Sequence, residues 1–206
     1  MKRITKIVVT GGPCGGKSTA LERIKEEFCA KGYTVLIVAE TATELISGGV
    51  APWTCGTNGQ YQMCQMKLQL EKERVFELAA GTMPQENILI VCDRGLMDNH
   101  AYMTEEEYFE SLKFIGMTEQ EAFGEYAAVF HLVTAAKGAE RFYTTANNTA
   151  RTETVTEARA LDEKTVSVWE AHPYHRIIDN STDFNGKMDR LIQEIDRFLR
   201  STQTTE

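Results

Sequence analysis

The stretch TGGPCGGKST, residues 10–19, constrains the fold of this chain more than any other feature of the sequence. It follows a short apolar run and precedes a segment whose apolar residues recur at helical spacing, so a strand, a loop and a helix are predicted in that order. Within the loop, Gly11 is followed by four residues and then by Gly16, Lys17 and Ser18, which is the P-loop spacing. A P-loop in this context predicts a phosphate-binding α/β domain.

The residue types of this loop suit phosphate binding. Glycines let successive backbone N–H groups turn toward a phosphate, and the start of the helix adds a favourable dipole. We expect Lys17 to face solvent and to neutralise charge on the β- and γ-phosphates of ATP or GTP, and Ser18 to ligate Mg²⁺. The predicted nucleotide contacts come from Gly11, Gly12, Pro13, Cys14, Gly15, Gly16, Lys17, Ser18 and Thr19.

Further apolar segments alternate with helical ones along the chain. Strands are predicted at 4–10, 33–40, 87–93, 128–134 and 176–179. Helices are predicted at about 60–80 and 185–200, and after the capping-box residues Thr104 and Thr118. This alternation predicts an α/β fold with a doubly wound parallel five-stranded sheet, and together with the P-loop it predicts a P-loop NTPase. The nucleotide-kinase type of this fold is what the family resemblance described below implies.

One domain is expected, because 206 residues with 42% hydrophobic composition can bury a single core and no linker or repeat divides the chain. We assign it to residues 1–200, with a helical lid at about 138–170 and a disordered tail at 201–206. The net charge of −8 disfavours nucleic acid as a partner. Five cysteines without a CxxC pair favour reduced thiols and a cytoplasmic location, and no stretch resembles a transmembrane segment.

Acidic residues follow two of the predicted strands, where they would meet the P-loop at the carboxyl edge of the sheet. Asp93 follows the third strand as a Walker B acid would, so we expect it to ligate Mg²⁺, with a cap or turn role as the alternative. Arg94 comes directly after it. Glu40 ends the second strand, where it either assists the acceptor substrate as a base or caps the next helix. Lys17, Glu40, Asp93 and Arg94 are therefore candidate catalytic residues.

Arginines lie between the last two predicted strands, at positions 141, 151 and 159. Mobile arginines that close over a transferring phosphoryl group stabilise its negative charge and exclude water. Arg151 and Arg159 are therefore candidate catalytic residues, and Arg141 is a candidate nucleotide contact. The alternative is a solvated helix face on which these arginines pair with acidic neighbours such as Asp162 and Glu163.

Two loops are candidate binding elements. The segment 179–187, DNSTDFNGK, is expected to meet the nucleobase through Asn180 and Asp183, although a turn that caps the last helix fits the same letters. The glycine-rich segment 47–59 contains Trp53 and is either a substrate flap or an ordinary connection. No NKxD guanine-reading motif follows the fourth strand, which disfavours a Ras-like mechanism without excluding GTP.

The motifs AETAT, CDRGLMDNHAY, HLVTAAKGAERFY and HPYHRIIDNSTDF, together with the P-loop, resemble the P-loop domain of the TRPL translocation defect protein family. That family is related to the nicotinamide riboside kinase domain of bacterial NAD regulators and to nucleoside and nucleotide kinases. The resemblance spans residues 4–198 and implies a kinase-like, nucleotide-binding core of AAA type with a lid.

Two functions are consistent with these features. The first is a Mg²⁺-dependent kinase that transfers the γ-phosphate of ATP to a nucleoside-like or other small-molecule acceptor, which the sequence does not identify. The second is a regulatory module that binds ATP or GTP and acts through a partner, which the resemblance places in membrane traffic. The lid arginines and Glu40 distinguish the two, because a pure switch has no need of them.

Overall fold

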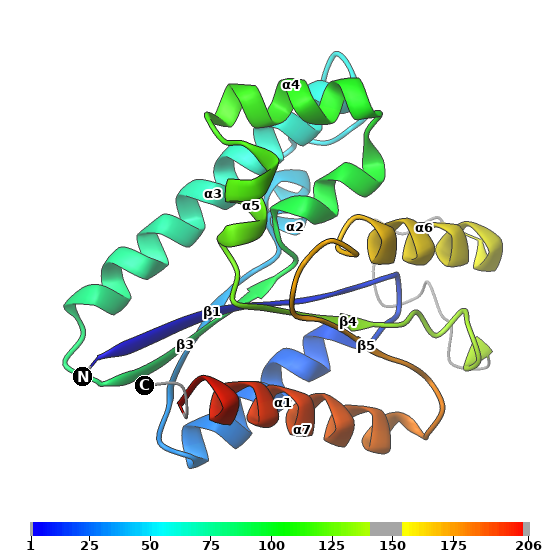
Figure 1. Cartoon of the computed structure of the whole chain (residues 1–206). Coiled ribbons are helices and arrows are strands. Elements are labelled where there is room, and N and C mark those ends of the chain that lie inside the picture. Colours follow the sequence, from blue (N-terminus) through cyan, green and yellow to red (C-terminus); the bar gives the residue numbers. More distant parts are fainter. Residues whose placement is uncertain (1, 141–153, 204–206) are drawn as a thin grey trace.

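The computed structural model describes residues 2–140 and 154–203, and in this part of the chain five strands form one sheet (Figure 1). The strands are β1 (Arg3–Gly11), β2 (Thr34–Val38), β3 (Asn87–Asp93), β4 (Ala128–Leu132) and β5 (His175–Ile178). They lie in the order β2-β3-β1-β4-β5, and every pair is parallel. The predicted α/β fold with a parallel five-stranded sheet is therefore confirmed.

Both faces of this sheet are covered by helices, which explains the near-continuous apolar strands. Side chains alternate along β1, so Ile7 and Val9 pack on one face and Val8 on the other. On the Ile7 face lie α1 (Lys17–Ala30) and α7 (Phe184–Gln203), which run side by side in Figure 1. On the Val8 face lie α3 (Asn58–Thr82), α4 (Glu105–Ile115), α5 (Glu119–Gly124) and α6 (Val155–Ser167).

Capping boxes start four of these helices. The boxes predicted at Thr104 and Thr118 open α4 and α5, and each threonine side chain accepts a hydrogen bond from the N–H three residues on. Thr57 and Thr154 open α3 and α6 in the same way, although the sequence analysis had not used them. Two short elements were also not anticipated, α2 (Thr41–Ser47) and the 3₁₀ helix η1 (Leu96–Tyr102).

Two differences from the predicted bounds change the interpretation of particular residues. Helix α7 continues to Gln203, so residues 201–203 extend the last helix instead of beginning a disordered tail. Strand β2 ends at Val38, which places Glu40 at the N-cap of α2. Arg141, Arg151 and the residues 204–206 lie outside the described part of the chain. Within that part, none of the helices has the length and apolar character needed to cross a bilayer.

Candidate functional site

The P-loop turns sharply between β1 and α1, and its glycines are required by close packing as well as by backbone angles. Gly11 has a φ of +146°, and a Cβ there would overlap the carbonyl oxygen of Leu132 on β4. Gly16, at the N-cap of α1, has a φ of +93°. Cys14 is a non-glycine residue with a φ of +56°, so the loop holds one side chain in the left-handed region. The P-loop backbone thus forms a tight turn at a helix N-terminus, which we call the cradle. This arrangement suits an anion.

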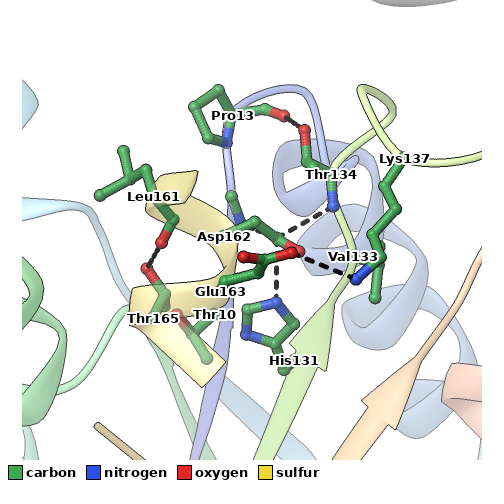
Figure 2. A network of polar contacts seen from close by, with 12 residues as sticks. Thr10, Pro13, His131, Val133, Thr134, Lys137, Leu161, Asp162, Glu163 and Thr165 are labelled. Carbon is green, nitrogen blue, oxygen red and sulfur yellow. Dashed lines mark hydrogen bonds and ion pairs between the residues drawn. The ribbon is translucent and has the colours of Figure 1, made fainter. Parts of the chain in front are cut away.

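A buried carboxylate of α6 fixes this cradle from behind (Figure 2). Asp162 is 2% exposed, and its Oδ1 accepts hydrogen bonds from the backbone N–H groups of Gly12 at 2.9 Å and Thr134 at 3.0 Å. The Nε2 of His131 lies 3.0 Å from the same oxygen. The hydroxyl of Thr134 in turn donates to the carbonyl of Pro13. Asp162 is therefore a structural partner of the P-loop, and the alternative in which it pairs with arginines on a solvated face is wrong.

A buried amine holds the other side of the cradle. Lys187 is 3% exposed, and its Nζ donates to the carbonyls of Gly15 at 3.0 Å and Val133 at 2.6 Å and to Asn180 Oδ1 at 2.9 Å. Burial lowers the pKa of Lys187 to about 8, which Asp162 opposes. The sequence alone does not single out Lys187, because a lysine in an amphipathic helix is ordinarily a solvated residue.

The loop predicted to meet a nucleobase forms one wall of a cavity. The amide Nδ2 of Asn180 donates to the carbonyls of Thr134 and Lys137, at 2.8 and 2.7 Å, so this side chain organises the wall. Asp183 Oδ1 accepts a hydrogen bond from the backbone N–H of Gly186 at 2.8 Å and so caps the start of α7. This contact is the one expected if the segment 179–187 is a turn that caps the last helix.

The cavity lies beside the P-loop and has a volume of about 600 Å³. It is lined by Cys14, Gly15, Ala135, Gly138, Ala139, Glu140, Asn180, Thr182, Asp183, Phe184 and Lys187. These residues come from the P-loop, the segment after β4 and the segment that enters α7. Its size and mixed lining are typical of a site for a small ligand. Asn180 and Asp183 both line this cavity. A loop that meets the nucleobase needs this position, and the contact with a nucleobase stays a prediction.

On the opposite side of the P-loop, the predicted catalytic side chains gather at the carboxyl edge of β2 and β3. Lys17 is only 6% exposed, so the expectation that it faces solvent is wrong. It acts electrostatically on both Glu40 and Asp93. The Nε of Arg94 donates to Glu40 Oε1 at 2.8 Å. The structure therefore brings together Lys17, Glu40, Asp93 and Arg94.

The two carboxylates differ in electrostatic environment. Burial alone would raise the pKa of Glu40, but Arg94 and Lys17 together with the Thr43 hydroxyl lower it to about 2. Glu40 stands at the N-cap of α2, yet its side chain accepts no capping N–H and faces Arg94 instead. Burial raises the pKa of Asp93, with Lys17 opposing this shift. Glu40 is thus held as an anion by its cationic neighbours, whereas the cations near Asp93 only partly compensate the negative charge of its buried carboxylate.

Asp93 fits the requirements of a magnesium ligand. Its Oδ1 is buried and has no hydrogen-bond partner in the described chain. Ser18 lies exposed in the first turn of α1. Across the described residues no cluster of three His, Cys, Asp or Glu side chains has the spacing of a metal cage. One carboxylate and one hydroxyl suit Mg²⁺, which keeps waters and takes other oxygens from phosphates.

Arg94 is held in an unusual backbone conformation by groups that the sequence analysis missed. Its φ is +70°, and its N–H donates to the carbonyl of Val9 at 3.1 Å. Its Nη1 lies 3.6 Å from Asp98 Oδ1. Asp98, on η1, also accepts from the hydroxyl of Thr10, from the N–H of Gly95 at 2.7 Å and from the Trp169 indole at 3.3 Å. Asp98 therefore anchors the turn that presents Arg94.

Of the lid arginines, Arg159 is the one in the described chain. It lies on α6, and its guanidinium donates to the carbonyl of Ala136 and to Glu140 Oε1, the latter at 2.7 Å. This contact ties α6 to the segment that lines the cavity. Arg159 thus pairs with an acidic side chain, as the alternative to a catalytic lid arginine expected, although Glu140 lies in the segment after β4 and not on the same helix.

Comparison with known proteins places the chain among nucleotide-binding P-loop domains. A family model described as an AAA domain matches residues 6–187, which contain both the P-loop and the carboxylate edge. No curated protein matches the chain. The match supports a P-loop NTPase-like domain that binds nucleotide, and it does not single out the TRPL translocation defect family.

Proposed function

The chain belongs to the AAA domain family, and from this premise we propose that it is a Mg²⁺-dependent kinase that transfers the γ-phosphoryl group of ATP to a hydroxyl of a small molecule. One observation carries the proposal. Glu40 is fixed by Arg94 at 2.8 Å and lies in the field of Lys17, at the sheet edge where the γ-phosphate of a P-loop nucleotide ends. A nucleotide switch needs a carboxylate such as Asp93 for Mg²⁺, but it has no need of a second carboxylate that an arginine holds beside the γ-phosphate.

Each group has a role in this reaction. The P-loop N–H groups and Lys17 bind the β- and γ-phosphates, while the 600 Å³ cavity receives the nucleoside half of ATP. Ser18 and Asp93 would hold Mg²⁺, which neutralises charge on the phosphates when bound. Glu40 accepts a hydrogen bond from the acceptor hydroxyl and directs its oxygen at the γ-phosphorus. As the new O–P bond forms, the bond from the γ-phosphorus to the β-phosphate oxygen breaks and ADP leaves, while the hydroxyl proton passes to Glu40 and from there to solvent. A pKa of about 2 suits this orienting role, because phosphoryl transfer depends more on positioning than on a strong base.

The test is transfer of label from γ-labelled ATP to a metabolite extract, followed by identification of the labelled products. We expect an acceptor-dependent labelled compound that is absent with Lys17→Ala and strongly reduced with Glu40→Gln. GTP in place of ATP measures the preference for the base. If the label appears only as inorganic phosphate whatever is added, the regulatory module becomes the better assignment, and a search for a protein partner follows.

A further inference from the structure

We propose that the acceptor subsite extends from Glu40 and Arg94 to the hydroxyl of Tyr61, and that it takes a polyhydroxy compound without negative charge, such as a nucleoside, in preference to a phosphorylated one. The inference rests on the proposed kinase function. It adds the chemical class of the acceptor and a residue of α3 that contacts it.

The first observation is a buried polar atom without a partner. Tyr61 lies in the first turn of α3 and is 2% exposed, yet its Oη makes no hydrogen bond in the described chain. A buried hydroxyl without a hydrogen bond costs free energy unless a ligand or a water molecule forms one with it. Burial raises the pKa of Tyr61 to about 12, with a further contribution from the Glu40 carboxylate. The hydroxyl therefore stays protonated, and it lies within the electrostatic influence of the carboxylate that orients the acceptor.

The second observation concerns Arg94, which pairs with the same carboxylate. Its Nη1 is buried and makes no hydrogen bond in the described chain, although Asp98 Oδ1 lies 3.6 Å away. Tyr102 acts electrostatically on both Arg94 and Tyr61. The Asn58 Nδ2 donates to the carbonyl of Tyr102 at 2.6 Å and joins the start of α3 to the end of η1. Tyr61 Oη and Arg94 Nη1 are thus buried donors without a hydrogen bond in the described chain, and the Glu40 carboxylate pairs with Arg94 and acts electrostatically on Tyr61.

The third observation is the charge balance around these donors. Glu40, Asp93 and Asp98 are carboxylates, whereas Lys17 and Arg94 are the cations that act on them. Lys72, which contacts the carbonyl of Ala39, is paired with Glu44 at 2.7 Å. In a working kinase Lys17 binds the donor phosphates, and Arg94 is already paired with Glu40 and Asp98.

In this assignment neither Lys17 nor Arg94 therefore remains to compensate an anion on the acceptor. An acceptor phosphate would lie among carboxylates in a partly buried site, which is unfavourable. Hydroxyl groups fit instead, because they donate to Glu40 and accept from Tyr61 and Arg94. A nucleoside or sugar alcohol supplies adjacent hydroxyls of this kind.

The test measures binding separately from transfer. Calorimetric titrations are made in Mg²⁺ and a non-hydrolysable ATP analogue with adenosine, guanosine, uridine, cytidine, ribose and ribitol, each beside its phosphorylated counterpart. We expect at least one uncharged compound to bind at least about tenfold more tightly than its phosphorylated form. Tyr61→Phe should weaken that compound by about tenfold, and Tyr174→Phe, on the opposite face of the sheet, should not.

The outcomes separate this inference from the kinase proposal. Equal or tighter binding of the phosphorylated compounds, or no binding of any uncharged compound, overturns the acceptor class. An unchanged affinity in Tyr61→Phe overturns the subsite. If an uncharged compound binds and depends on Tyr61 but receives no phosphate from ATP, the kinase function fails while the binding site stands.

Discussion

Asp162 on α6 accepts a hydrogen bond from the backbone N–H of Gly12 in the P-loop, at 2.9 Å and across 150 positions of sequence. Because the same oxygen accepts from Thr134 and lies 3.0 Å from His131, one side chain joins the P-loop, the end of β4 and α6. Any movement of α6 on nucleotide binding must therefore act on the loop that holds the phosphates.

The first prediction concerns this contact. Asp162→Ala leaves the buried donors on Gly12, Thr134 and His131 without an acceptor, so the free energy of unfolding should fall by about 3 kcal/mol or more. Urea denaturation measures the change. Glu163→Ala on the same helix, where the side chain is 68% exposed, is the matched control and should change stability little. Equal effects of the two variants would show that Asp162 does not support the P-loop.

The order of strands and helices could be predicted, because each strand is an apolar run that only a doubly covered sheet can bury. The P-loop and the carboxylates after β2 and β3 could be placed for the same reason, since parallel strands bring their carboxyl ends to one edge. Asp93 and Glu40 were found in this way, and the structure sets both near Lys17.

The supporting residues could not be found from sequence patterns. Asp162 and Lys187 occupy helices whose other polar residues are largely solvated, and Asp98 lies on a 3₁₀ turn that has no periodic signal. A buried polar residue in a helix has the same letters as an exposed one, and only the tertiary contacts distinguish them. The burial of Lys17 could not be predicted, because it depends on tertiary packing near the carboxylates Glu40 and Asp93, on which Lys17 acts electrostatically.

The second prediction tests nucleotide binding itself. Lys17→Ala should weaken binding of Mg-ATP on the order of a hundredfold, because a charge-assisted contact to the phosphates is lost. Calorimetry gives the affinity, and circular dichroism verifies that the variant is folded. Lys25→Ala, an exposed lysine of the same helix, is the control. Unchanged affinity in Lys17→Ala would contradict a working P-loop.

The third prediction concerns magnesium. Asp93→Asn removes a carboxylate whose buried Oδ1 has no protein partner in the described chain, so the Mg²⁺ concentration needed for nucleotide binding should rise by about tenfold. Binding of ATP without metal should change far less. Titrating Mg²⁺ at fixed ATP measures the effect, with Asp189→Asn on the exposed side of α7 as the control. A superimposable magnesium titration would make Asp93 a structural residue.

The fourth prediction is a pH dependence. The folded-state pKa of Glu40 is lowered to about 2 from 4.5, so its contribution to stability is present above pH 4.5 and is lost as the pH falls toward 2. The full shift corresponds to about 3 kcal/mol. Urea denaturation between pH 6 and 3 should therefore show the parent losing its advantage over Glu40→Gln as the pH falls.

Glu44→Gln, on the exposed face of α2, controls for the loss of a carboxylate from this helix and should change stability little. A constant difference between the parent and Glu40→Gln across this range would mean that Arg94 does not hold Glu40 as an ion pair.

The last prediction separates a catalytic lid arginine from a structural one. Arg159 donates to Glu140 at 2.7 Å, and a catalytic Arg159 must leave this carboxylate when it turns to the γ-phosphate. Arg159→Ala should then lower single-turnover transfer on the order of a hundredfold with little change in nucleotide affinity, and Arg151→Ala should do the same.

Glu140→Gln distinguishes the two roles, because it weakens the resting ion pair while keeping the arginine. If Arg159 acts on the transition state, Glu140→Gln should retain or increase the transfer rate, since the guanidinium is released more easily. If the pair merely holds the cavity wall against α6, Glu140→Gln and Arg159→Ala should lose nucleotide affinity together and the transfer rate of bound ATP should persist. Rapid-quench measurement of labelled product at saturating ATP, with affinity measured in parallel, decides between these outcomes.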